Sequence, residues 1–274
     1  MISDYLMLTG LNILLAWSVY VILLSGSLSF ANGGFMGIGC YAAGVVTVKL
    51  GWPLLLALPV AGLAAGLLGA VVGLPALRTR GVYLILVTIG ITACVKVTIE
   101  SIPYLGGVQG FGGMGGSALW QVWGLVALVG AALFALSRTP LQRILDAIRE
   151  DETVARCLGA NVVYLKVAMF GIGAALAAVA GGLYGHYYVF VTPDHFNILV
   201  SIYLVLYVIL GGVNNPWGPA LGATAMSLLP EASRVLQDWR PTVFGVLILG
   251  LLLVRPQGLL PFRLRTARPP RPRP

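Results

Sequence analysis

The sequence predicts an all-α, polytopic membrane protein: a transmembrane helical bundle of about nine spans (eight to ten), with one or two broken or re-entrant helices. Two features of its composition lead there. Of the 274 residues, 58% are hydrophobic and 9% are charged, and the mean hydropathy is +0.93. A soluble domain carries about 25% charged residues, so a water-soluble enzyme and a disordered chain are excluded. The 36 glycines and 16 prolines indicate closely packed and interrupted helices.

The first five candidate spans are apolar runs of bilayer length, for which about 20 residues suffice. The first run lacks the basic start and the cleavage site of a signal peptide, so we expect a retained helix. The second run is interrupted at Asn32-Gly33-Gly34 and is expected to be bent or half-crossing. The five candidates are 5–24, 28–48, 53–74, 82–100 and 118–136.

Four further candidates follow the polar stretch 137–163. The third of these four is short and glycine-rich, which again indicates a broken or half-crossing helix. The four are 164–184, 197–213, 216–230 and 241–255, so residues 1–262 form one transmembrane domain. The tail 263–274 alternates arginine with proline and is expected to be disordered, as a solvated anchor or against anionic lipid head groups.

The orientation follows from the basic residues, because cytoplasmic loops carry an excess of Lys and Arg. Twelve of the 17 basic residues lie in two loops and the tail, whereas the opposite loops hold only Lys49, Arg234 and Arg240. With nine crossings, this bias predicts an N-terminus outside and a C-terminus in the cytoplasm. The twelve are Arg78, Arg80, Arg138, Arg143, Arg149, Arg156, Arg255, Arg263, Arg265, Arg268, Arg271 and Arg273.

The stretch 137–163 is the most informative part of the chain, because four of the nine acidic residues gather there. Helical spacing places its apolar residues near one face, which indicates a surface helix with charged flanks. Gly159 follows and suits a C-terminal cap. Such a helix either is a solvated connector or docks into a partner. In a docked helix, Ala155 allows close approach, and salt bridges at the rim come from Arg149, Glu150, Glu152 and Arg156.

The run DAIREDETVARCLGAN at 146–161 resembles the cytoplasmic loop of branched-chain amino acid permeases of the LivM type. These are membrane subunits of binding-protein-dependent ABC importers. Further stretches at 24–41, 211–223 and 255–259 are similar to the same family, in the same order. The chain departs from the family pattern at 31–32, 105–107 and 214–216, which bears on the solute and not on the class of transporter.

The resemblance implies a permease subunit that forms half of a pathway for hydrophobic or branched-chain amino acids in a bacterial inner membrane. It implies as partners two ABC ATPase subunits, a second homologous permease in a heterodimer, a periplasmic solute-binding protein and the lipid bilayer. The net charge of +8 is a topology signal and does not indicate nucleic acid. The loop is then the coupling helix, and the residues expected to contact an ATPase are Arg149, Glu150, Glu152, Ala155, Leu158 and Gly159.

Two glycine-interrupted regions in comparable places of the two halves are the candidates for the translocation path. Backbone groups freed at a break must line a cavity or be satisfied by protein, and asparagine side chains can serve as partners. For most of the glycines, helix packing is the favoured interpretation. The candidate path residues are Asn32, Gly33, Gly34, Gly211, Gly212, Asn214 and Asn215.

Charge inside the spans is nearly absent. Lys96 and Glu100 are spaced i, i+4 near the outer end of the fourth span, and a local ion pair is favoured over a substrate site. No P-loop and no catalytic or metal-ligating constellation stands out, so we expect a non-catalytic subunit without cofactors, with ATP hydrolysed by its partners. The alternatives are a related permease for urea or short amides, a self-sufficient channel or facilitator, and a membrane scaffold.

Overall fold

A computed structural model describes residues 2–79 and 81–232; the ninth predicted span, 241–255, and the tail 263–274 lie outside them. Each of the first eight predicted spans coincides with one helix, to within four residues at each end. The elements are α1 (Ile2–Leu24), α2 (Asn32–Val48), α3 (Leu54–Ala76), α4 (Val82–Ser101), η1 (Pro103–Leu105), η2 (Gly107–Gln109), β1 (Phe111–Gly112), α5 (Leu119–Leu136), α6 (Pro140–Glu150), α7 (Glu152–Cys157), α8 (Val162–Tyr188), β2 (Phe190–Val191), η3 (Pro193–Phe196), α9 (Ile198–Gly211) and α10 (Trp217–Ala232).

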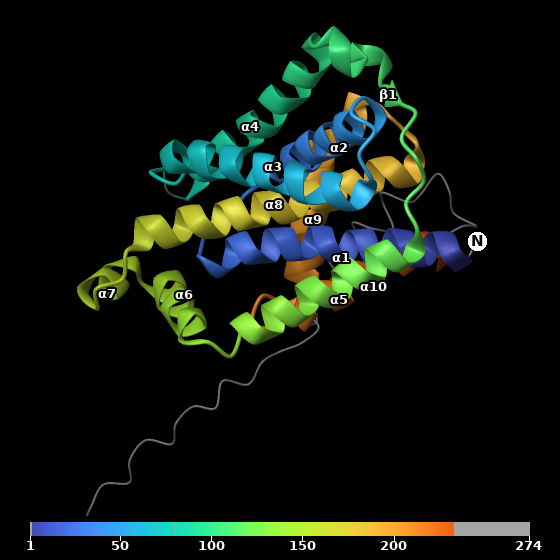
Figure 1. Ribbon diagram of the computed structural model, residues 1–274. Coiled ribbons are helices and arrows are strands. Elements are labelled where there is room, and N and C mark those ends of the chain that lie inside the picture. The colour runs from blue at the N-terminus through green and yellow to red at the C-terminus, as the bar shows by residue number, and fades with distance from the viewer. Residues whose placement is uncertain (1, 80, 233–274) are drawn as a thin grey trace, which may run out of the picture.

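Helix α2 lies at the centre of the bundle, where α3, α4, α8 and α9 pack around it (Figure 1). The interruption predicted at Asn32-Gly33-Gly34 is wrong, because α2 begins at Asn32 and the non-helical residues are 25–31, before it. Helices α2 and α8 cross with their backbones in contact. A Cβ on Gly39 would overlap the backbone of Ala178, and a Cβ on Gly181 would overlap the carbonyl of Met36. Small residues permit such close crossings in membranes.

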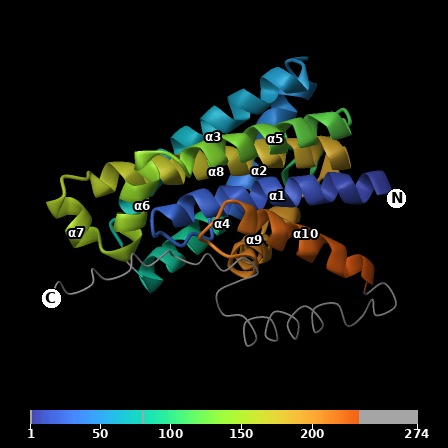
Figure 2. The same ribbon diagram turned by 90° about the horizontal axis from the view of Figure 1, so that it is seen from below.

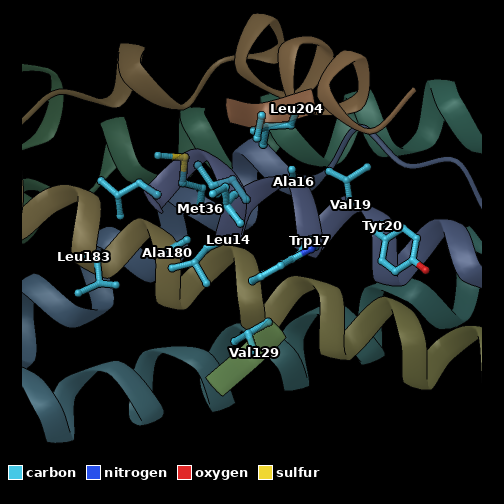
Figure 3. Packing of buried hydrophobic residues seen from close by; sticks show 14 of the residues in the cluster. Leu14, Ala16, Trp17, Val19, Tyr20, Met36, Val129, Ala180, Leu183 and Leu204 are labelled. Carbon is cyan, nitrogen blue, oxygen red and sulfur yellow. The ribbon is translucent and has the colours of Figure 1, made fainter. Parts of the chain in front are cut away.

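The hydrophobic core forms along α1. Figure 3 shows Leu14 and Trp17 on one side of α1, where Val129 of α5 lies beside Trp17, and Leu204 of α9 on the other side. All four side chains are buried, and Trp17 keeps only 2% of its surface exposed. The core thus joins helices that lie far apart in the sequence, and the indole of Trp17 contributes both apolar area and a polar N–H group.

The outer faces of α3, α4 and α5 expose large apolar side chains, among them Leu63 (67%), Leu67 (68%) and Leu128 (66%). Apolar surfaces of this extent are unusual in soluble monomers and suit contact with lipid. In the described part of the chain, five helices are long and apolar enough to cross a membrane: α1, α3, α4, α5 and α8. The apolar helices α2 and α9 are shorter, with 17 and 14 residues.

Helix α9 does not run along the bundle. Figures 1 and 2 show it lying crosswise to α1 and α8, after which α10 turns back toward the end that carries the N-terminus. The seventh predicted span, 197–213, is therefore helical but is not an axial crossing. Its shortness agrees with this placement, since 14 residues extend only about 21 Å.

The two ends of the bundle carry different structures (Figure 2). The N-terminus lies at the end where β1 and β2 pair in antiparallel fashion, with Phe111 opposite Val191. Segments α6 and α7 lie at the opposite end. The single surface helix predicted for 137–163 is wrong, because two helices occupy this stretch and meet at Asp151.

Candidate functional site

Asp151 divides the α6–α7 segment. Its backbone is extended, and its carboxylate accepts hydrogen bonds from the backbone N–H groups of Thr153 (2.7 Å) and Val154 (3.3 Å). These donors hold the pKa of Asp151 below its ordinary value, because they stabilise the charged form. Asp151 therefore caps the N-terminus of α7 and redirects the chain after α6.

The predicted glycine, Gly159, follows the last turn of α7 and caps its C-terminus. The N–H of Gly159 donates to the carbonyl of Arg156 (2.9 Å), and the N–H of Ala160 donates to the carbonyl of Ala155 (3.1 Å). Gly159 has φ +87°, the left-handed conformation that this Schellman arrangement requires and that glycine adopts without steric cost. The predicted role of Gly159 as a helix cap is confirmed.

The inner face of the segment is packed against its own chain. Ile148, Ala155 and Val162 form a buried cluster in which each side chain exposes no more than 2% of its surface. Ala155 therefore points toward α6 and the start of α8. Ala155 is closely packed within the chain, and its predicted contact with an ATPase stays a prediction.

Glu152 is also engaged within the chain. Its carboxylate forms an ion pair with the ammonium group of Lys166 on α8, and the second oxygen lies 3.7 Å from the guanidinium of Arg156. Lys166 exposes only 12% of its side chain, so this contact is shielded from solvent more than an ordinary surface pair. Glu152 thus ties α7 to α8 within the chain, and its predicted salt bridge at the rim of a partner interface stays a prediction.

A hollow of about 330 Å³ lies between α6 and the end of α7. Leu158 stands at its edge with 77% of its surface exposed, and Gly159 beside it is also exposed, whereas Arg149 and Glu150 are exposed but do not line the hollow. An exposed leucine beside a hollow and charged side chains has the composition of a protein-docking surface. The hollow is lined by Arg143, Ile144, Ala147, Ala155, Leu158, Gly159 and Ala160.

Arg149 makes the contact that links the two predicted residue sets. Its Nη2 donates a hydrogen bond to Oδ1 of Asn214, in the turn between α9 and α10, over 3.0 Å. On the other side, Gly26 of the α1–α2 turn lies so close that a Cβ there would be 3.3 Å from Cα of Arg149. The end of α6 thus lies against two turns that connect membrane helices.

The first set of candidate path residues lies inside the bundle. Asn32 is fully buried and donates through Nδ2 to the hydroxyl of Ser18 (2.8 Å), and the N–H of Gly33 donates to the hydroxyl of Ser201 on α9 (2.9 Å). Gly34 faces Thr92 of α4, where a Cβ would lie 3.1 Å from Cα of Thr92. This arrangement leaves the start of α2 tightly enclosed.

The second set forms the turn from α9 to α10. A Cβ on Gly211 would overlap the backbone of Gly218, and Gly212 has φ +97°. Asn215 caps α10 by accepting a hydrogen bond from the N–H of Trp217 (3.2 Å). The two sets do not meet, because the first contacts α9 near its start and the second forms its end. Their connection through α9 depends on Ser201, whose signal in the sequence is a single serine in an apolar helix.

The predicted ion pair between Lys96 and Glu100 is confirmed, and a third residue, Asp194, joins it. Lys96 lies 3.7 Å from Glu100 and 2.6 Å from the carboxylate of Asp194 in η3. The Lys96 ammonium holds the pKa of Asp194 below its ordinary value, because it stabilises the carboxylate. This contact ties the segment that leads into α9 to helix α4.

Known proteins resemble the chain over nearly its whole length. A family profile described as the permease component of the branched-chain amino acid transport system matches residues 1–255. The high-affinity branched-chain amino acid transport system permease protein LivM of Escherichia coli is 31% identical over 94% of this chain and 69% of its own. No solved structure matches the chain at a significant level.

Two relatives align with about half of the chain. The permease protein LivH of Escherichia coli is 29% identical over 53% of this chain and 46% of its own, and BraD of Pseudomonas aeruginosa is 36% identical over 49% and 44%. Both proteins are named for branched-chain amino acid transport.

Proposed function

The chain belongs to the family of branched-chain amino acid transport permeases, and from this membership we propose that it forms one half of the pathway through which a binding-protein-dependent ABC importer carries hydrophobic amino acids. The match over residues 1–255 carries this proposal. Its partners in a bacterial inner membrane are two ATPase subunits, a second homologous permease and a periplasmic solute-binding protein. The presence of both LivM-type and LivH-type relatives supports the pairing of two permeases.

The proposed topology places α6–α7 in the cytoplasm and the N-terminus outside. Their positions at opposite ends of the bundle support this, as does the concentration of arginines around α6 and α7. Counting nine spans requires α9 and α10 to cross separately. If they form a re-entrant pair, two crossings are removed and the C-terminus still faces the cytoplasm, because the parity is unchanged.

Cys157 offers a direct test of this topology. It is a free, exposed cysteine at the end of α7, whereas Cys40 is buried. A membrane-impermeant maleimide should label Cys157 in inverted membrane vesicles and not in intact spheroplasts. Cys157→Ser is the matched control for labelling of the exposed Cys94. Labelling of Cys157 from the outside would overturn the orientation.

The hollow at α6–α7 is the proposed seat of an ATPase subunit. Leu158 is its most exposed apolar side chain, so Leu158→Asp should abolish co-purification of the ATPase by introducing a charge into the contact. Arg138→Gln is the control, because Arg138 lies over the ring of Phe134, outside the lining of the hollow. Undiminished co-purification of Leu158→Asp would exclude the hollow as the docking surface.

Transport is tested with the complete complex in proteoliposomes. Uptake of radiolabelled leucine should require ATP, both ATPases and the solute-binding protein, because this chain has no P-loop of its own. Competition by isoleucine and valine, and none by urea or acetamide, would support the proposed solute. Competition by urea or amides alone would assign a different solute, and uptake without ATPases would identify a self-sufficient facilitator.

A further inference from the structure

Helix α9 is held at both ends by side chains of other elements. At its beginning, Asp194 of η3 pairs with Lys96 of α4, and at its end Asn214 accepts a hydrogen bond from Arg149 of α6. Between these two contacts runs α9, a short crosswise helix. Near its beginning, the hydroxyl of Ser201 accepts a hydrogen bond from the backbone N–H of Gly33 at the start of α2. One rigid helix therefore connects the α6–α7 segment to the break that precedes α2.

Arg149 is placed to transmit force to this helix. Its backbone lies against Gly26, so the end of α6 has little freedom on that side, and its guanidinium reaches Asn214 on the other. The same α9–α10 turn is fixed to the core by Trp17, whose Nε1 donates to the carbonyl of Pro216 over 2.7 Å. A displacement of α6 is thus passed to the α9–α10 turn through the side chain of Arg149, while the indole of Trp17 holds the turn against the core.

The other route from the segment into the membrane is stiff. Glu152 ties α7 to Lys166 of α8, but α8 crosses α2 with backbone in contact at Gly39 and Gly181. Packed interiors resist continuous deformation, so α8 moves only together with α2. Helix α9 lies with its backbone against α10, at Gly222 and Tyr207, but side-chain contacts that can break and form again join it to α4 and α6, so α9 and α10 can shift together.

We propose that Arg149 is a positioning residue for transport: its hydrogen bond to Asn214 couples movement of the α6–α7 segment to α9, and through Ser201 and Gly33 to the start of α2. This assignment deepens the proposed function and rests on it. It changes the role of Arg149, which the sequence predicts to contact the ATPase. The guanidinium instead acts within the permease, on the turn that holds Asn214 and Asn215.

The test compares ATP hydrolysis with solute uptake in the reconstituted complex. Arg149→Leu and Asn214→Leu should each lower the number of leucine molecules taken up per ATP by about three- to tenfold, the range expected for the loss of one ordinary hydrogen bond. ATP hydrolysis and co-purification of the ATPases should stay near wild type. The double variant should be no worse than either single variant, because both remove the same contact.

Asn214→Asp keeps an acceptor for Arg149 and should retain the wild-type ratio of uptake to hydrolysis. Arg138→Gln, which removes an arginine that lies over Phe134, should also leave the ratio unchanged. Equal losses of hydrolysis and uptake in Arg149→Leu, or losses that multiply in the double variant, would overturn the proposal. If the wild-type complex takes up no leucine under any condition, the proposed function fails; if it does and Asn214→Leu is fully coupled, only this assignment fails.

Discussion

Two regions of the molecule are built on opposite principles. At the α2–α8 crossing, the backbones of the two helices touch at Gly39 and Gly181. At α6–α7 and α9, single polar side chains make the connections: Glu152 to Lys166, Arg149 to Asn214, and Asp194 to Lys96. Backbone packing has one arrangement, whereas side-chain contacts can break and form again. We call the α2–α8 crossing the rigid frame, because its backbones are in contact. We call the three polar side-chain contacts the joints, because elements can shift relative to one another there.

The largest effect should come from the frame. Gly39→Val places a side chain into the backbone of Ala178, where nothing flexible can move aside. We expect destabilisation of about 3 kcal/mol or more, as for severe overpacking. Thermal unfolding in detergent and the yield of monodisperse protein measure it.

Gly124 of α5 provides the matched control, because a Cβ at that position meets no atom within 4 Å. Gly124→Val should change stability by no more than about 0.5 kcal/mol, as exposed substitutions do. If Gly39→Val folds as well as Gly124→Val, the crossing is not the rigid frame, and the contrast with the polar contacts disappears.

A smaller effect is expected at the joint between α7 and α8. Lys166→Met leaves the Glu152 carboxylate without its partner on α8, which should cost about 1–2 kcal/mol, between the values for surface and buried pairs. Limited proteolysis at the α6–α7 segment should accelerate accordingly. The exchanged pair, Glu152→Lys with Lys166→Glu, should recover part of the loss, and an exchanged pair no better than Lys166→Met would show that the charges do not act on each other.

The sequence predicts the helices of the molecule better than the side-chain contacts between them. Apolar runs place the described spans to within four residues, because length and hydropathy suffice for helices in lipid. Gly159 is recognisable because a helix end in the left-handed conformation favours glycine. Pairings between distant residues are different. Nothing local to Arg149 indicates Asn214, and nothing local to Ser201 indicates Gly33, because these contacts depend on how α9 crosses the bundle.

Asp151 shows the limit on a local scale. Its N-cap residue type is a recognisable helix start, yet the apolar period runs on through it from Leu145 to Ala155 and favours one continuous helix. In the structure the capping hydrogen bonds to Thr153 and Val154 prevail, and Ala155 still reaches the same buried cluster. Two short helices thus bury the face that one longer helix was predicted to bury.

The next effect tests this cap. Asp151→Ala removes the acceptor for the N–H groups of Thr153 and Val154, so amide hydrogen exchange in α7 should accelerate by about fivefold, as for the loss of an N-cap. Asp151→Ser supplies another capping oxygen and should show most of the wild-type protection. Equal exchange in Asp151→Ala and the wild type would mean that burial of Ala155 alone holds α7 in place.

The smallest effect concerns the joint at the other end of α9. Because Lys96 lowers the pKa of Asp194 in the folded protein, the contribution of this carboxylate is present above the ordinary Asp pKa of 3.8 and is lost only as the pH falls through the lower, folded-state value. Protection of the η3 amides, corrected for intrinsic exchange, should therefore be the same at pH 7 and pH 5 as far as Asp194 is concerned. Asp194→Asn should lower that protection by about two- to threefold at both pH values, the range of an exposed ion pair.

Glu100 and His195 face the same contact, and because both remain in Asp194→Asn, the ratio of variant to wild type isolates Asp194. A ratio that approaches one at pH 5 would show that the carboxylate is already protonated there, and that this joint is weaker than its 2.6 Å contact indicates.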